Sequence, residues 1–300
     1  MEINIEEAKM DYVYYPGCSL ETSGKAYDES VRFVFQQLGH NLIEIDDWNC
    51  CGATYYMATK ETISLVISAR NLALAEQIGQ DLIAPCSSCY TILYKTNKIL
   101  QSNPILKAKV DQSLRRDNLE YHLSLRIRHP LEVLVNDIGL NTIREKRVVS
   151  LEGRRIAPYY GCQIVRPDRG IDNKEDPQMM DELLRTLGAE VVPFPAKVRC
   201  CGGMLMTTYP DVALELNLEI LACAARAQAE VIVTTCPLCQ INLEAYQNKI
   251  NKKFNTRFHL PVLYFTQILG LALGGTPRQV GLHRQIIPFH FKAINQEEAR

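Results

Sequence analysis

The chain has 300 residues, of which 47% are hydrophobic, enough to bury the core of one to three domains. Its formal net charge is −1 and its charges are mixed, so it lacks the basic surface that a nucleic-acid partner requires. The amino terminus lacks the apolar segment of a signal peptide, and the most apolar stretch, 260–275, is shorter than the ~20 residues that span a bilayer. We therefore expect a globular cytoplasmic protein without a transmembrane segment, in which 260–275 packs on the domain or on a partner.

Strands and helices are predicted to alternate along both halves of the chain. In the first half, the strands are YVYYP (12–16), NLIEI (41–45) and DLIAP (81–85), and the helices cover 24–38, 61–78 and 88–100. In the second half, the strands are RIAPYY (155–160), EVVPF (190–194) and EVIVTT (230–235). This alternation is typical of right-handed βαβ units, so we predict an α/β fold with parallel sheets.

Ten of the eleven cysteines form two sets with nearly the same spacing. The first set is Cys18, Cys50, Cys51, Cys86 and Cys89, and the second is Cys162, Cys200, Cys201, Cys236 and Cys239. The intervening residues number 31, 34 and two in the first set and 37, 34 and two in the second. Such a repeat predicts two homologous domains, with a six-residue insertion after Cys162.

The domain boundary is expected near 145–153, which gives a first domain over 11–145 and a second over 146–292. The cysteine-free region 101–150 is predicted to be a helical connector that packs on the first domain, with apolar residues at helical intervals over 127–140. This region contains Arg115, Arg116, Arg126 and Arg128. A solvated helix face explains these arginines better than an acidic partner does.

Each cysteine group follows a predicted parallel strand, so three loops at one edge of each sheet should bring five thiols together. In a reducing compartment such thiols indicate metal or redox chemistry, because adjacent cysteines rarely bond to each other. Four thiolates bind Zn²⁺ or a [4Fe–4S] cubane, and either would leave one cysteine over. The fifth ligand favours an unusual cluster or a reactive thiol, with zinc as the less favoured metal.

The pattern of one Cys, then Cys-Cys-Gly, then Cys-x-x-Cys, present twice, resembles the paired cysteine-rich CCG domains of the B subunit of heterodisulfide reductase. The resemblance covers about 11–290, and YYPGCSL, DWNCCGAT and ARNLALAE are similar to bacterial and sulfur-metabolism relatives. It implies that each five-cysteine set binds a non-cubane [4Fe–4S] cluster and that a disulfide substrate lies between the two clusters. It further implies a flavin-binding A subunit and a ferredoxin-like C subunit as partners, and this chain has no G-x-G-x-x-G after a strand.

Three alternatives remain open at this point. The first is the equivalent subunit of a sulfur-oxidising complex that acts on carrier-bound sulfur. The second is a non-catalytic electron-transfer or anchoring subunit, as CCG domains form in some succinate, fumarate and glycolate oxidoreductases. The third is a scaffold stabilised by zinc.

Other residues receive smaller roles. Five glycines adjoin expected ligands, where they either let backbone N–H groups approach sulfur or form ordinary loops: Gly17, Gly52, Gly161, Gly202 and Gly203. Pro85 and Pro237 are expected to set turns, and Trp48 either shields the first cluster or belongs to the core. Cys223 is expected to be a buried spare, and no histidine lies near a motif in the sequence. An anionic substrate would be met by Lys25, Arg166 or Arg169, although solvated charges are commoner.

Overall fold

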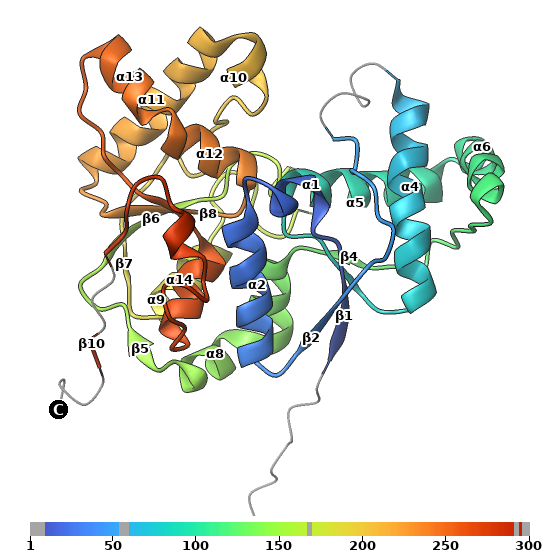
Figure 1. Cartoon of the computed structure of the whole chain (residues 1–300), viewed down its shortest axis with the longest axis horizontal. Helices are drawn as coiled ribbons and strands as arrows, with labels where there is room; N and C mark the ends of the chain where they lie inside the picture. The colour runs from blue at the N-terminus through green and yellow to red at the C-terminus, as the bar shows by residue number, and fades with distance from the viewer. Residues whose placement is uncertain (1–9, 54–59, 167–169, 291–293, 296–300) are drawn as a thin grey trace, which may run out of the picture.

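The computed structural model describes residues 10–53, 60–166, 170–290 and 294–295. Within these residues each half of the chain forms one sheet of four parallel strands, as the α/β prediction required (Figure 1). The first sheet has the order β2-β1-β3-β4, and the second has the equivalent order β7-β6-β8-β9. The repeat in the sequence is therefore a repeat in topology.

The strands and helices of the first half follow the predicted order. They are β1 (Asp11–Tyr14), α1 (Gly17–Glu21), α2 (Lys25–Gln37), β2 (Asn41–Glu44), α4 (Glu61–Ile78), β3 (Leu82–Ile83), α5 (Ser87–Ser102) and β4 (Ile127–Arg128). Leucine and alanine fill most of the buried positions of α4, and Gly79 ends the helix in the left-handed conformation that glycine adopts without strain.

The second half repeats this arrangement. Its elements are β6 (Arg155–Tyr159), α9 (Met179–Thr186), β7 (Glu190–Val191), α10 (Leu205–Thr208), α11 (Pro210–Arg226), β8 (Val231–Thr234), α12 (Pro237–Ala245), α13 (Gln247–Phe254), β9 (Val262–Tyr264), α14 (Phe265–Ala272) and η3 (Leu282–Arg284). The strand β8 reads VIVT and is buried throughout, as expected for a parallel strand covered on both faces.

The region between the two sheets is mainly helical, as predicted, but it also contributes a strand. It contains α6 (Pro104–Leu114), η1 (Arg115–Asp117), β4, α7 (Pro130–Val133), η2 (Leu134–Gly139) and α8 (Leu140–Lys146). A further strand, β5 (Val149–Ser150), pairs antiparallel with β10 (Ile294–Asn295). The helical prediction for 127–140 is therefore wrong at its start, because Ile127 and Arg128 complete the first sheet.

The interpretation of Arg128 as part of a solvated helix face is also wrong. Its side chain is 5% exposed and makes ion pairs with Glu132, Asp81 and Asp137. The three carboxylates compensate the charge of the buried guanidinium, and a cation on the surface would not need this compensation. By contrast, Arg115, Arg116 and Arg126 are exposed, as expected.

The apolar stretch 260–275 lies mostly in the interior. It forms β9 and α14, and α14 packs along α2 of the first half (Figure 1). In return, α7 and α8 of the first half pack on α9 of the second. One continuous hydrophobic core therefore includes buried residues of both halves, such as Tyr27, Phe35, Phe265 and Leu269. Within the described residues no helix is long and apolar enough to cross a membrane.

Candidate metal and redox centre

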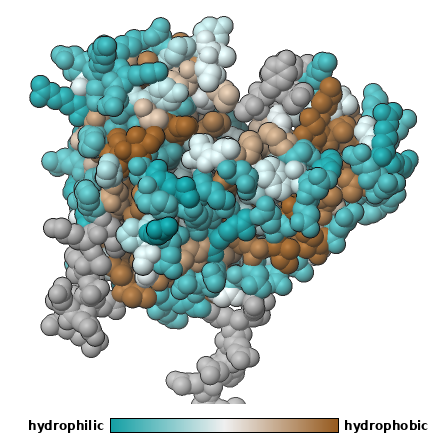
Figure 2. Space-filling view, in the orientation of Figure 1, coloured by the Kyte–Doolittle hydropathy of each residue, from teal (hydrophilic) through white to brown (hydrophobic). Residues whose placement is uncertain are grey.

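The ten repeated cysteines all lie beyond the carboxyl ends of parallel strands, either in the connecting loops or, for Cys18, Cys89 and Cys239, in the first turn of the helix that follows. Cys18 follows β1, Cys50 and Cys51 follow β2, and Cys86 and Cys89 follow β3. In the second half, Cys162, the Cys200–Cys201 pair and the Cys236–Cys239 motif follow β6, β7 and β8. This is the placement that the sequence predicted. In the orientation of Figure 1, the surface is indented between the lobe that carries α10 to α13 and the lobe that carries α4 (Figure 2).

The thiols pair in the same way in both halves. The Sγ atoms of Cys18 and Cys50 are 3.8 Å apart, and those of Cys51 and Cys89 are 3.2 Å apart. In the second half, Cys162 is hydrogen-bonded to Cys200, and the Sγ atoms of Cys201 and Cys239 are 3.5 Å apart. Each set therefore contains one outer pair and one inner, buried pair.

The fifth thiol of each set meets its counterpart from the other half. Cys86 and Cys236 are hydrogen-bonded to each other. This contact is the largest cause of the raised pKa of Cys86, whereas the pKa of Cys236 is lowered first by its hydrogen bond with Cys239 and then by the one with Cys86. Close by, Ser87 Oγ donates a hydrogen bond of 3.0 Å to the carbonyl of Thr235. We call this place, where the two Cys-x-x-Cys loops touch, the junction. The two cysteine sets are thus neighbours in space although 150 residues separate them in sequence.

Thiolates are the form of cysteine that binds metals, and the local contacts favour this form at equivalent positions. The hydrogen bond from Cys18 lowers the pKa of Cys50, and the hydrogen bond from Cys162 lowers the pKa of Cys200 to about 6. Cys86 and Cys236 cap the amino ends of α5 and α12, where the helix dipole favours an anion. Pro237 is accordingly the first residue of a helix rather than part of a turn.

Two buried tyrosines that the sequence analysis did not select hold the Cys-Cys loops in place. The Tyr15 hydroxyl donates to the carbonyl of Asn49 at 2.8 Å, and the Tyr159 hydroxyl donates to the carbonyl of Arg199 at 2.7 Å. Asn49 and Arg199 each immediately precede a cysteine pair. The available signal was the repeated YYPGC and YYGC, each of which contains one of these tyrosines.

The glycines beside the cysteines are required by close packing. A Cβ atom on Gly17 would lie 3.1 Å from Cys89 Sγ, and one on Gly161 would lie 3.1 Å from Cys239 Sγ. Both residues have φ +69°, a region that other residues rarely adopt. In addition, the backbone N–H of Gly202 contacts Cys200 Sγ at 3.3 Å. The expected approach of backbone N–H groups to sulfur is therefore present in the second half.

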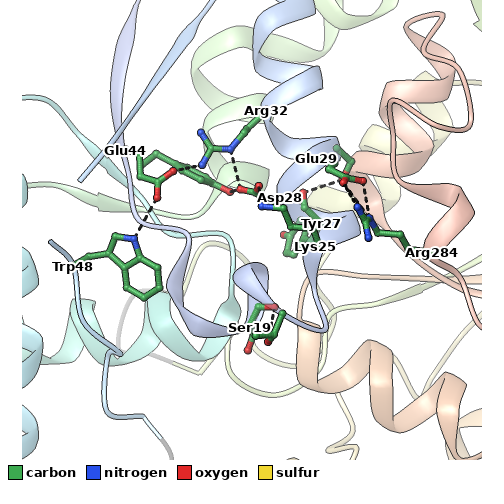
Figure 3. A network of polar contacts seen from close by, with 12 residues as sticks. Ser19, Lys25, Tyr27, Asp28, Glu29, Arg32, Glu44, Trp48 and Arg284 are labelled. Carbon is green, nitrogen blue, oxygen red and sulfur yellow. Dashed lines mark hydrogen bonds and ion pairs between the residues drawn. The ribbon is translucent and has the colours of Figure 1, made fainter. Parts of the chain in front are cut away.

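A charged network joins the first Cys-Cys loop to α2 (Figure 3). Trp48 Nε1 donates to Glu44, whose carboxylate also binds Arg32, and Arg32 in turn donates to Asp28 at 2.9 Å. Lys25 also pairs with Asp28, at 3.0 Å, so the structure does not present it as a free cation for a substrate. Trp48 packs, half-buried, against the hydrophobic core, as the second of its two expected roles required, and it also lines a cavity of about 560 Å³ beside Cys50.

The other two proposed cations have different outcomes. The hydrogen bond between Cys162 and Cys200 is the largest influence on both thiols, and it raises the pKa of Cys162 and lowers the pKa of Cys200; the charge of Arg166 is close enough to favour both thiolates as a smaller influence. Arg169 lies outside the described residues. Cys223 is buried in α11, as expected for a spare cysteine.

The expectation that no histidine lies near a motif is wrong in three dimensions. The Nε2 atom of buried His129 is 2.8 Å from the carbonyl of Pro85, next to Cys86. Its Nδ1 atom accepts a hydrogen bond from Leu131 N, so Nε2 carries the proton, and burial lowers the pKa of the ring to about 4. The strand β4 brings His129 to the junction, and the sequence analysis did not predict that strand.

Within the described residues, no three cysteine, histidine, aspartate or glutamate side chains converge closely enough to hold a single metal ion. The thiols instead follow one another along each sheet edge, since hydrogen bonds also link Cys50 to Cys51, Cys86 to Cys89 and Cys236 to Cys239. In each set the groups that contact one another are all thiols, and none of these pairs includes an imidazole or a carboxylate. All-thiolate donors of this kind are ligands of iron–sulfur clusters and of structural zinc.

Comparison with known proteins agrees with the repeat. The family described as CCG, a cysteine-rich domain, matches residues 12–94 and 156–244. The 8-methylmenaquinol:fumarate reductase membrane anchor subunit of Wolinella succinogenes is 31% identical, with 92% of this chain and 97% of that protein covered. The B subunit of the ferredoxin:CoB-CoM heterodisulfide reductase of Methanosarcina mazei is 30% identical, with 90% and 92% covered. A heterodisulfide reductase B-subunit-like protein of Archaeoglobus profundus is 31% identical, with the same coverage.

Among solved structures, a hypothetical protein from Helicobacter pylori superposes with a TM-score of 0.78 over 95% of this chain. The two sequences are 16% identical, so this likeness concerns the fold alone, and the chain spans 54% of that protein. The paired domain match and the relatives aligned over most of their length agree on one assignment. The chain belongs to the family of paired cysteine-rich CCG domain proteins that includes the B subunit of heterodisulfide reductase.

Proposed function

We propose that the chain is the iron–sulfur subunit of a heterodisulfide reductase-like complex and carries its thiol/disulfide redox site. The observation that supports this most directly is the meeting of two equivalent five-thiol sets at Cys86 and Cys236. A site that serves a two-electron reaction with two one-electron centres needs such proximity. The proposed domains are 11–145 and 146–292, one for each set.

The cofactor proposal is two [4Fe–4S] clusters, of the non-cubane kind that the resemblance implies. Cys18, Cys50, Cys51, Cys86 and Cys89 would hold one cluster, and Cys162, Cys200, Cys201, Cys236 and Cys239 would hold the other. When bound, each cluster would supply one electron. Reduction of a disulfide consumes two electrons and two protons, breaks the S–S bond and releases two thiols, so both sets are needed for one turnover.

The residues of the chain divide this work by their burial. Cys18, Cys50 and Cys200 are exposed, and the cavity of about 560 Å³ opens beside Cys50, so a sulfur substrate can approach the outer thiols. The inner thiols and the junction are buried and exclude water. Tyr15 and Tyr159 hold both Cys-Cys loops through their backbone carbonyls. Electrons would come from partner subunits, for which we propose a flavin-binding A subunit and a ferredoxin-like C subunit.

A second candidate is favoured by the Wolinella succinogenes relative, which is named as the membrane anchor subunit of a fumarate reductase. In that case the same two clusters would pass electrons between other subunits, and the chain would not act on a disulfide. A third candidate uses the same site in reverse, to oxidise carrier-bound sulfur. The three candidates would use the same cysteine sets. They differ in what the clusters react with: a disulfide, the redox centres of other subunits, or carrier-bound sulfur.

The metal content of the chain tests the common part of this proposal. Protein purified without oxygen should contain about eight irons and eight acid-labile sulfides per chain, four for each set. Stoichiometric zinc with little iron would contradict the proposal and favour a zinc scaffold. After chemical reduction, release of two thiols per disulfide consumed supports the sulfur-active subunit, whereas a loaded protein that never consumes disulfide supports the electron-transfer subunit.

A further inference from the structure

The junction contains two tyrosines with unusual surroundings. Tyr27 and Tyr264 are fully buried, and within the described residues neither hydroxyl donates a hydrogen bond. Their rings are stacked, with centroids 4.3 Å apart and an interplanar angle of 3°. A buried hydroxyl that donates no hydrogen bond destabilises a folded protein, so two of them side by side in a native core require an explanation.

The two tyrosines come from opposite halves of the chain. Tyr27 lies on the first turn of α2, next to Asp28 (Figure 3), and Tyr264 is the last residue of β9. Phe265 packs edge-on against Tyr27, so the tyrosine rings are fixed by the packing of α14 on α2. Because both rings are held in place, their hydroxyl groups have little freedom to find partners elsewhere.

Both tyrosines lie beside the junction. Tyr264 pairs with Thr234 in the register of β9 and β8, and the ring of Phe265 lies 6.1 Å from the rings of both Tyr27 and His129. Burial raises the pKa of Tyr27 above its usual value, and the charge of Cys86 is the next largest cause. Burial also raises the pKa of Tyr264, followed by the charges of Cys236 and Cys86. The start of α2 abuts the same loop, since a Cβ atom on Gly24 would lie 3.3 Å from Pro237 Cβ. Two O–H groups without acceptors therefore flank the place where the cysteine sets meet.

Other polar groups at the junction already have partners. His129 bonds to the carbonyl of Pro85, and Ser87 bonds to Thr235. Cys86 and Cys236 are also hydrogen-bonded to each other. Metal binding removes the protons of both thiols and leaves two anionic sulfurs at one buried place, where each needs a donor. The two tyrosine hydroxyls are donors without acceptors at this place.

We propose that Tyr27 and Tyr264 donate hydrogen bonds to the sulfur atoms of Cys86 and Cys236 in the metal-loaded protein. This inference rests on the proposed function, because it requires both cysteine sets to bind iron. Hydrogen bonds to an anionic sulfur stabilise the more negative, reduced state of a cluster and raise its reduction potential. One donor from each half would adjust both clusters together, so the junction acts as a single electrostatic unit.

The test uses the full, iron-loaded chain and three variants, Tyr27→Phe, Tyr264→Phe and the double change. Each loses one or both hydroxyls and keeps the stacked rings. In a redox titration followed by electron paramagnetic resonance, each single variant should lower the ratio of reduced to oxidised cluster roughly three- to tenfold at a fixed potential. The corresponding shift is about 30–60 mV downward for a one-electron couple. The double variant should shift further.

The matched control is Tyr12→Phe. Tyr12 is buried in the same half, its hydroxyl donates to the Met10 sulfur at 3.6 Å, and the causes of its raised pKa are burial and the charges of aspartates and arginines rather than cysteines. The control should leave the potentials unchanged. If the tyrosine variants contain full iron but have the same reduction potentials as the control, this inference is overturned and the proposed function is left intact. Wild-type protein without iron would overturn both.

A second measurement protects the test against variants that fail to bind iron. In wild-type protein exchanged into D₂O, electron–nuclear double resonance should detect exchangeable protons coupled to the clusters. These couplings should be reduced in any tyrosine variant that retains iron and should remain in Tyr12→Phe. The double variant keeps the backbone N–H groups and so gives their contribution to the coupling. If wild-type protein shows no exchangeable coupling beyond that contribution, the tyrosines do not donate hydrogen bonds to the loaded site.

Discussion

At the scale of single residues, the structure places polar side chains where a buried site needs them. Tyr15 and Tyr159 hold the Cys-Cys loops, and His129 holds the loop before Cys86. Glu244 of α12 is a further buried group, 2% exposed, that accepts hydrogen bonds from Gln240 and from the backbone of Val262 and Ile286. Burial raises its pKa from 4.5 to about 7.

This shift predicts how stability depends on pH. A carboxyl group whose pKa is raised on folding favours the folded state below its unfolded value, and this contribution is lost as the pH rises through the folded value. From pH 4.5 to 7, wild-type protein should therefore lose stability relative to Glu244→Gln, on the order of 2 kcal/mol. Thermal unfolding of both proteins across this range measures the difference. Parallel curves would show that Glu244 titrates normally.

At the scale of elements, the reciprocal exchange of helices is what joins the halves. The helix that follows the last strand of the second sheet, α14, packs on α2, while α7 and α8 pack on α9. Phe265 is central to this contact, because its ring lies 6.1 Å from those of both Tyr27 and His129. The same contact fixes the geometry of the junction.

Truncation of Phe265 should therefore weaken the contact between the halves. Phe265→Ala removes a fully buried ring and should lower the free energy of unfolding by about 3–5 kcal/mol, measured by urea titration. Val148→Ala is the control, since Val148 is 59% exposed and its truncation should cost less than about 0.5 kcal/mol. Equal effects of the two substitutions would mean that α14 contributes little to joining the halves.

At the scale of the whole molecule, the repeat produces two equivalent thiol sets that meet at one point. Each set has its own sheet, its own Cys-Cys loop and its own supporting tyrosine. Their contact through Cys86 and Cys236 makes them a candidate for one catalytic unit rather than two independent centres.

Single substitutions in the two sets test this unity. Cys51→Ala and Cys201→Ala should each abolish disulfide turnover in the assembled complex, because one remaining set cannot supply both electrons. Each should leave the iron of the other set largely in place, since metal binding is coupled to the local fold. The double variant should be no worse than either single one, as is typical of groups that act together. Rates near half of wild type for each single variant would indicate two independent sites.

The sequence by itself determined the α/β class, the repeat and the placement of the ten cysteines beyond the carboxyl ends of parallel strands. These features depend on local patterns, namely apolar runs of strand length, helical periodicity and the spacing of one residue type. The strands β4 and β9 were not predicted, because Ile127–Arg128 and Val262–Tyr264 are two and three residues long and carry little periodic signal.

Only the tertiary structure decided which sulfurs meet and what surrounds them. The contact of Cys86 with Cys236, the stacking of Tyr27 on Tyr264 and the approach of His129 to Pro85 all join residues at least 44 positions apart. Such contacts depend on how two complete halves pack against each other, through helices whose apolar faces have many possible partners. A repeat in sequence predicts two similar sites, but the packing of α14 on α2 is what makes them neighbours.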